Sequence, residues 1–173
     1  MLNQELRIKN QESRTGFTLV EVIIYLAIVS TILVSISYLI IDIISGQTKS
    51  LAGAEVNYNI RFISAQLARD IKSAQNIGSI SADTLVLALP GDDITYNFDA
   101  GNQKITRQLG VATPEDLNTT QVEVTGSFDD NSYLQRSKNV GIGLTVVYKN
   151  PSNLPDYNVS SIITLSLELK GKR

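Results

Sequence analysis

A polar leader and a long apolar segment open the chain. Residues 17–44 contain no lysine or arginine and only two carboxylates, Glu21 and Asp42. At a rise of about 1.5 Å per residue, a helix of this length exceeds the roughly 30 Å hydrocarbon core of a bilayer. The pattern therefore predicts a membrane-spanning helix over residues 17–44, with Asp42 near the far interface. Glu21 lies inside the apolar run, where a charge costs about 2.5–3.5 kcal/mol and requires a partner.

An apolar stripe with helical spacing continues through residues 45–78, which contain no proline. Its members recur every three or four positions, at Val56, Ile60, Ile63, Leu67, Ile71, Ala74 and Ile77. Such spacing places them on one face of an α-helix, and charged residues such as Arg69 and Asp70 lie mostly off that face. The pattern predicts that the helix continues to about Gly78 and packs its stripe on a sheet. Gly46 and Gly53 each cost about 1 kcal/mol relative to alanine and mark places where the helix can bend or unwind.

Residues 79–173 alternate between apolar and polar positions, which is typical of strands with one buried face. The alternation is clearest in six stretches, at residues 85–89, 94–98, 105–109, 122–124, 140–146 and 163–169. A turn at residues 99–102 joins two of them into a hairpin. We therefore predict an α+β fold, in which the long N-terminal helix packs on an antiparallel β-sheet and residues 79–173 form a β-rich head.

Composition narrows the functional classes. The 173 residues include 15 Lys and Arg against 17 Asp and Glu, and no histidine, cysteine or tryptophan. Ser-His-Asp and Cys-His enzymes are excluded, as are disulfides and thiolate metal sites, and we expect a protein that is not an enzyme. The balanced charge does not favour a nucleic acid as a partner.

The charges that flank the apolar segment predict its orientation. Arg7, Lys9 and Arg14 precede it, whereas Lys49 is the first cation after it. Under the positive-inside rule the N-terminus lies in the cytoplasm and residues 45–173 lie outside. The apolar run is too long for a secretory signal peptide and ends Ile-Ser-Gly instead of with an A-x-A-like site. A plain single-pass anchor fits the length and the flanks but gives no reason for Glu21.

Residues 16–21 read Gly-Phe-Thr-Leu-Val-Glu at the start of the apolar run. This stretch resembles the class III signal of type IV prepilins and pseudopilins. The resemblance implies that residues 1–16 are a leader removed by a prepilin peptidase, which cuts between Gly16 and Phe17 and N-methylates Phe17. It also implies that residues 17–44 assemble into a helical filament with other pilin or pseudopilin subunits, on an inner-membrane platform. Thr15 departs from the family, which often has Lys or Arg directly before the glycine.

Cleavage after Gly16 would supply the partner that Glu21 lacks. It creates an ammonium on Phe17, four residues before Glu21 on the same helical face and about 6 Å away along the axis. The pair can close within one subunit or between neighbours, and a subunit in the wrong axial register would leave charges unpaired. The helix macrodipole also favours an anion in the first turn. The family reading, in which this glutamate sets the assembly register, agrees with this physics.

Two further stretches are more distantly similar to J-type minor pseudopilins of type II secretion. They are residues 59–71, in which Arg69 and Asp70 precede an aliphatic residue, and the predicted hairpin at residues 94–107.

Two acidic clusters are candidates for calcium, which some pseudopilins bind. Asp92, Asp93 and Asp99 flank a predicted strand, and residues 129–131 read Asp-Asp-Asn in an expected loop. Neither cluster has the ligand spacing of a known calcium loop. The sequence therefore favours turn and solvent roles, and no cofactor is expected.

Together the patterns predict a non-enzymatic filament subunit, a minor pilin or pseudopilin of a type IV pilus or of a type II secretion pseudopilus. It would wait in the bacterial cytoplasmic membrane before it joins an extracytoplasmic filament. A major pilin for adhesion or motility, a DNA-uptake pilin and a membrane-anchored extracytoplasmic binding domain remain alternatives. Abundance in sheared filaments distinguishes the first, a basic stripe the second, and an uncut leader the third.

Overall fold

The computed structural model describes residues 16–133 and 138–169. The chain divides into two compact units, an N-terminal unit that ends at Ile43 and a C-terminal unit that begins at Ile44. The α-helix α1 (Leu19–Ser73) contributes to both units, and every strand belongs to the second. The predicted α+β class is confirmed, because this one long helix packs against antiparallel sheets.

In the N-terminal unit, the apolar side chains of α1 are exposed. The most apolar window of α1 has a mean hydropathy of 2.5 and none of it is buried. The helix is therefore long and apolar enough to cross a membrane, as predicted. Its serine and threonine hydroxyls need no outside partner, because those of Ser30, Thr31, Ser35 and Ser37 each donate to the carbonyl four residues earlier at 2.6–2.9 Å.

In the C-terminal unit, α1 buries the predicted stripe. The buried apolar members are Val56, Ile60, Ile63, Leu67, Ile71 and, directly after the helix, Ala74. The helix runs without interruption through Gly46 and Gly53, so it does not unwind at either glycine. Adding a Cβ at either position would meet no atom within 4 Å, which means that packing does not require glycine there.

The predicted end of the helix near Gly78 is wrong, because α1 ends at Ser73. The Ser73 hydroxyl donates to the carbonyl of Asp70 at 2.9 Å, and the next free amide, that of Gln75, donates to Ala88 at 2.8 Å. Residues Asn76–Ile80 then form strand β1, which pairs antiparallel with β2 (Thr84–Ala88). Pairing with β2 therefore overrides the helical spacing that the position of Ile77 suggests, and the β-rich region begins before residue 79.

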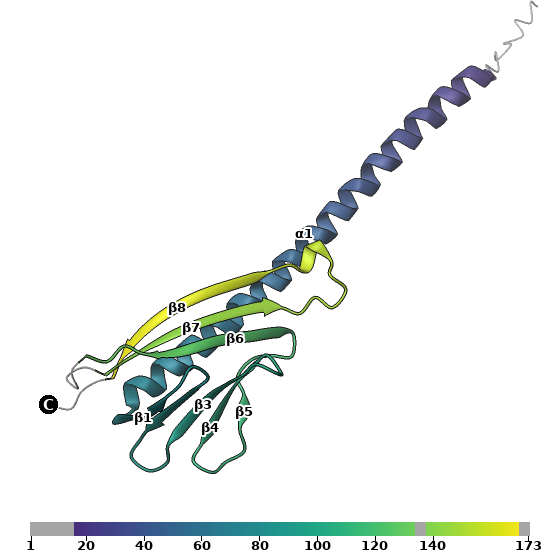
Figure 1. Cartoon of the computed structure of the whole chain (residues 1–173). Helices are drawn as coiled ribbons and strands as arrows, with labels where there is room; N and C mark the ends of the chain where they lie inside the picture. The colour runs from purple at the N-terminus through teal and green to yellow at the C-terminus, as the bar shows by residue number, and fades with distance from the viewer. Residues whose placement is uncertain (1–15, 134–137, 170–173) are drawn as a thin grey trace, which may run out of the picture. The chain divides into compact units, whose positions relative to one another are not determined.

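The strands form two antiparallel sheets instead of the single sheet that the sequence predicted (Figure 1). The first has the order β1-β2-β3-β4-β5 and is completed by β3 (Ile94–Asp99), β4 (Lys104–Leu109) and β5 (Glu115–Asp116). The second has the order β6-β7-β8, with bounds Val122–Asp130, Asn139–Tyr148 and Ser160–Glu168. The short 3-10 helix η1 (Pro155–Tyr157) lies between β7 and β8. All six stretches that alternate in the sequence lie in or overlap a strand, and β1 and β5 are additional.

One apolar core joins α1 to both sheets within the C-terminal unit. The alternating positions of the strands supply its side chains, among them Leu85, Leu87, Tyr96, Ile105, Ile142 and Leu144. Phe98 of β3 and Phe128 of β6 connect the two sheets, with ring centroids 4.7 Å apart. Gly126 of β6 lies so close to them that an added Cβ would come within 2.6 Å of the Phe98 ring and 2.3 Å of the Gly143 carbonyl oxygen. A side chain at residue 126 is therefore incompatible with this packing.

Candidate processing and assembly site

The residues around the predicted cleavage point lie directly before the first turn of α1. Thr18 caps the helix, because its hydroxyl accepts a hydrogen bond from the Glu21 amide at 3.3 Å and its carbonyl accepts from the Val22 amide at 3.2 Å. Gly16 and Phe17 thus lie outside the helix, in backbone that is exposed. No atom lies within 4 Å of a Cβ built on Gly16, so the fold itself does not require glycine there.

Glu21 is distinguished from its surroundings by its burial. Every other residue from 16 to 43 is exposed, whereas Glu21 is half-buried. Its Oε1 accepts a hydrogen bond from the Tyr25 hydroxyl at 3.2 Å, and its place in the first turn lets it interact favourably with the helix dipole. In the described part of the chain, Oε2 accepts no hydrogen bond, so this oxygen is free to receive a cation.

Tyr25 is a member of this site that the sequence reasoning missed. Phe17, Glu21 and Tyr25 follow one another at intervals of four residues, which places them on one face of α1. The rings of Phe17 and Tyr25 meet edge to face, with centroids 6.1 Å apart and planes at 75°. The interval of four from Glu21 to a hydroxyl-bearing side chain is the signal that could have identified it.

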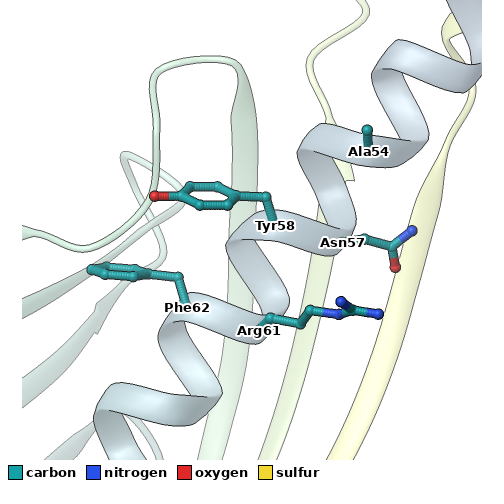
Figure 2. Close-up of a pocket in the computed structure, with 5 residues that line it drawn as sticks. All are labelled: Ala54, Asn57, Tyr58, Arg61 and Phe62. Carbon is teal, nitrogen blue, oxygen red and sulfur yellow. The ribbon is translucent and has the colours of Figure 1, made fainter.

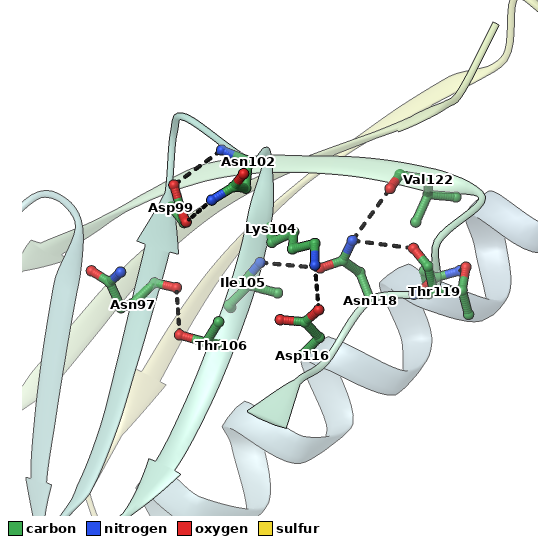
Figure 3. Close-up of polar contacts among 11 residues, drawn as sticks. Asn97, Asp99, Asn102, Lys104, Ile105, Thr106, Asp116, Asn118, Thr119 and Val122 are labelled. Atoms are coloured by element: carbon green, nitrogen blue, oxygen red, sulfur yellow. Dashed lines mark hydrogen bonds and ion pairs between the residues drawn. The ribbon is translucent and has the colours of Figure 1, made fainter. Parts of the chain in front are cut away.

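Among the candidate calcium ligands, Asp99 ends strand β3 at a turn, and Asp129 and Asp130 end strand β6 instead of lying in the predicted loop. The Asp99 carboxylate accepts hydrogen bonds from the side chain of Asn102 at 2.6 Å and from the amides of Gly101 and Asn102 at 3.0 Å (Figure 3). The Asn102 bonds, with a contribution from Gly101, lower the pKa of Asp99. Asp92 and Asp93 are exposed, and Asp93 uses its carbonyl to accept from the Gly110 amide. Among the described residues, no group of three or more acidic side chains is placed to hold a metal ion.

A buried polar cluster centres on Asp70, which the sequence pattern placed off the apolar stripe but which is only 5% exposed. Its carboxylate accepts from the Tyr96 hydroxyl at 2.5 Å, from Arg107 Nε at 2.7 Å and from Gln66 Nε2 at 3.2 Å. Burial, helped by the hydrogen bond to Asp70, raises the pKa of Tyr96. Every partner is satisfied, so the cluster fixes α1 to β3 and β4 and offers no free group for chemistry.

A second polar cluster holds α1 to the segment before β6. The buried Asn59 accepts from the Thr119 amide at 2.9 Å, and Glu55 accepts from the Thr119 hydroxyl at 2.6 Å. The neighbouring Asn118 accepts from the Ile105 amide at 3.1 Å and donates to the Val122 carbonyl at 3.2 Å (Figure 3). These side chains satisfy backbone groups that no strand pairs, which is a structural role.

The groove drawn in Figure 2 has a volume of about 540 Å³ and is lined by Ala54, Asn57, Tyr58, Arg61 and Phe62. All five belong to α1, and the rings of Tyr58 and Phe62 stack with centroids 6.1 Å apart. A groove lined by one helix is an exposed helix surface and does not enclose a ligand.

Comparison with known proteins agrees with the N-terminal site. A family described as the prokaryotic N-terminal methylation motif matches residues 13–37, which include Gly16, Phe17, Glu21 and Tyr25. No curated protein and no solved structure matches the chain. The match covers the residues around the capped start of α1 and much of the exposed apolar helix that follows. This chain therefore carries the class III signal of type IV pilins at residues 13–37, which include the start of the long helix of a pilin-like α+β fold.

Proposed function

We propose that this protein is a structural subunit, a minor pilin or pseudopilin, of a type IV pilus or a type II secretion pseudopilus. One observation carries the proposal. A helix with an exposed apolar surface begins at Leu19, within the matched signal, and a single half-buried carboxylate, Glu21, lies in its first turn. Such a helix is unstable in water and needs lipid or like helices around it.

In this proposal the chain first spans the cytoplasmic membrane with its N-terminus inside. A prepilin peptidase hydrolyses the bond between Gly16 and Phe17. The new amine of Phe17 loses a proton and takes a methyl group from a methyl donor, and the methylated amine is positively charged when it is protonated. Since Thr18 caps the helix, the bond that is cut lies in exposed, non-helical backbone that a peptidase can bind. Glycine at residue 16 allows close approach of another backbone.

Assembly then depends on Glu21. Its free Oε2 can bind the Phe17 ammonium of the same subunit or of a neighbour. In apolar surroundings an unpaired charge is penalised by several kcal/mol, so a subunit that joins in the wrong axial register is rejected. The site thus selects register and does not perform chemistry on a substrate.

The proposal of a minor subunit, instead of a major one, is supported by hydrogen bonds between two stretches of the chain. Residues 59–71 and 94–107 are the segments that are similar to J-type minor pseudopilins. Asp70 of the first stretch is bonded to Tyr96 and Arg107 of the second. The two similarities therefore concern one structural unit, in which the end of α1 is fixed to the β3–β4 hairpin.

The cleavage step is tested by the intact mass of the protein from membranes with and without the peptidase. We expect the processed form to lack residues 1–16 and to carry one methyl group on Phe17. A Gly16→Val variant should remain uncut, and its fold should be unchanged because nothing lies near that position. An uncut wild-type chain in both membranes would sink the proposal and favour a plain anchor.

The register step is tested by Glu21→Ala, with Asp42→Ala as the matched control in the same apolar helix. We expect processing to survive in both variants. Incorporation of Glu21→Ala into sheared filaments should fall about tenfold or more, which corresponds to about 1.4 kcal/mol or more, whereas Asp42→Ala should assemble normally. Normal assembly of Glu21→Ala would contradict the register role. The abundance of the wild-type chain in sheared filaments is a separate measurement, since a minor subunit should be scarce there and a major one abundant.

A further inference from the structure

The contact between Tyr25 and Glu21 raises the question of what accompanies the carboxylate before cleavage. We propose that Tyr25 is a positioning residue for Glu21. Its hydroxyl is the partner of the carboxylate in the uncut precursor, and after cleavage it stays on Oε1 and leaves Oε2 for the ammonium. This inference rests on the proposed function in one respect, namely that the chain enters the membrane as a precursor.

The geometry of three side chains supports this role. The Tyr25 hydroxyl donates to Oε1 of Glu21 at 3.2 Å, one helical turn away. The Tyr25 ring also contacts the Phe17 ring edge to face at 6.1 Å. Because its ring rests on Phe17 and its hydroxyl on Glu21, Tyr25 links the residue at the cleavage point to the carboxylate. Glu21 is the one half-buried residue among the exposed residues 16–43.

No other side chain of the described N-terminal unit competes for Glu21. Its titratable residues are Glu21, Tyr25, Tyr38 and Asp42, and residues 17–43 contain no lysine or arginine. Tyr38 and Asp42 lie about 25 and 31 Å farther along the helix axis than Glu21. Before cleavage, the nitrogen of Phe17 is a neutral amide and gives Glu21 no charge to pair with. A hydrogen bond to a carboxylate is strong in apolar surroundings, so the loss of this donor leaves the anion poorly supported.

After cleavage the two oxygens of Glu21 can serve two donors. A carboxylate accepts several hydrogen bonds, and a hydroxyl bound to Oε1 restricts rotation of the group. The methylated ammonium then finds Oε2 in a fixed direction along the same helical face. Tyr25 therefore prepares Glu21 for its partner in addition to stabilising it before the partner exists.

The proposal is tested on the full-length precursor in membranes of cells that lack the peptidase. Dicyclohexylcarbodiimide modifies carboxyl groups in apolar surroundings only while they hold a proton. The Tyr25→Phe variant keeps the ring and its contact with Phe17 but removes the hydroxyl, and Tyr38→Phe is the matched control in the same helix. We expect the rate of Glu21 modification at neutral pH, followed by mass spectrometry of the peptide, to rise about tenfold in Tyr25→Phe and to stay unchanged in Tyr38→Phe.

Equal rates in the wild type and in Tyr25→Phe would overturn the proposal, and so would complete protection of Glu21 in every variant. The measurement needs membrane insertion but neither cleavage nor assembly. Failure of the proposed function would appear separately, as a wild-type chain that the peptidase does not shorten.

Discussion

Asp70 combines a charge with nearly complete burial, and its energetics follow from its three partners. Tyr96 and Arg107 belong to β3 and β4, and Gln66 belongs to α1. Two charges taken out of water cost several kcal/mol each, and mutual attraction with full hydrogen bonding offsets that cost. A cluster of this kind contributes specificity of position, because α1 in any other register on the hairpin would leave a buried carboxylate unpaired.

Replacement of Asp70 by alanine should lower the free energy of unfolding of the C-terminal unit by about 3 kcal/mol, because Arg107 and the Tyr96 hydroxyl lose their partner. Arg69→Ala is the matched control, since Arg69 is exposed on the adjacent position and should change stability by about 0.5 kcal/mol or less. Denaturant titration of the full chain in detergent, followed by tyrosine circular dichroism, measures both. Equal effects of the two variants would contradict the structural role of the cluster.

Tyr96 should make the unfolding of the C-terminal unit sensitive to alkaline pH. Burial raises the pKa of Tyr96 in the folded protein, whereas in the unfolded chain the phenol loses its proton near the ordinary value of about 10. The stability from this group is therefore fully present below about pH 10 and is lost as the pH rises toward the folded value. In Tyr96→Phe this loss should be absent, so the difference in unfolding free energy between the wild type and the variant should shrink as the pH rises above about 10. A constant difference would show that the phenol does not titrate with unfolding.

At the scale of elements, the sequence predicts well wherever one local period decides the structure. The stripe of α1 and the six alternating stretches lie where their spacing placed them. β1 was missed because its burial does not alternate cleanly and because Ile77 continues the helical spacing. β5 has only two residues and no pattern. The division into two sheets and the close packing of Gly126 on Phe98 and Gly143 involve residues far apart in the sequence, which no local period encodes.

The candidate site also contains some residues that the local sequence identifies and others that only the fold brings together. Gly16, Phe17 and Glu21 are adjacent or one turn apart, so the motif contains them. The motif at residues 16–21 does not include Tyr25, which is identified only when the side chains one turn after Glu21 are considered as its partners. The partners of Asp70 lie on β3 and β4, far away in the sequence, and only the folded hairpin brings them to the helix.

Gly126 and Gly143 provide a paired test of how β6 and β7 pack. Gly126→Ala should destabilise the C-terminal unit by about 2 kcal/mol or more, because its Cβ would overlap the Gly143 carbonyl and the Phe98 ring. Gly143→Ala should be nearly neutral, since its nearest contact, the Ser127 hydroxyl at 3.6 Å, is at ordinary van der Waals distance. The melting temperatures of Gly126→Ala and Gly143→Ala in detergent test this expectation. Similar melting temperatures of the two variants would contradict the close packing at Gly126.

At the scale of the whole molecule, the two units differ in the surroundings that their surfaces require. The C-terminal unit has a core of its own, whereas the apolar side chains of the N-terminal unit are exposed and must be covered by lipid or by other helices. The charges around residues 17–44 predict that residue 152, in the exposed segment between β7 and β8, lies outside the cell membrane and that the leader lies inside.

The absence of cysteine allows a direct test of this orientation. Ser152→Cys should react in intact spheroplasts with a maleimide that cannot cross membranes. Asn3→Cys, in the precursor of cells without the peptidase, should react only after the membrane is opened. Labelling of Asn3→Cys from outside would reverse the predicted orientation.

The hydroxyls of Ser30, Thr31, Ser35 and Ser37 have a consequence for how a subunit could leave the bilayer. Each is bonded to the backbone of its own helix, so it requires the same from lipid as from a neighbouring protein helix. Since lipid tails are as apolar as the side chains of such helices, transfer of this surface from one to the other is close to neutral in free energy. The work of extraction then falls on the few polar groups that are not bonded to the helix backbone, and among them the Glu21 carboxylate and its partner decide when a subunit departs and where it stops.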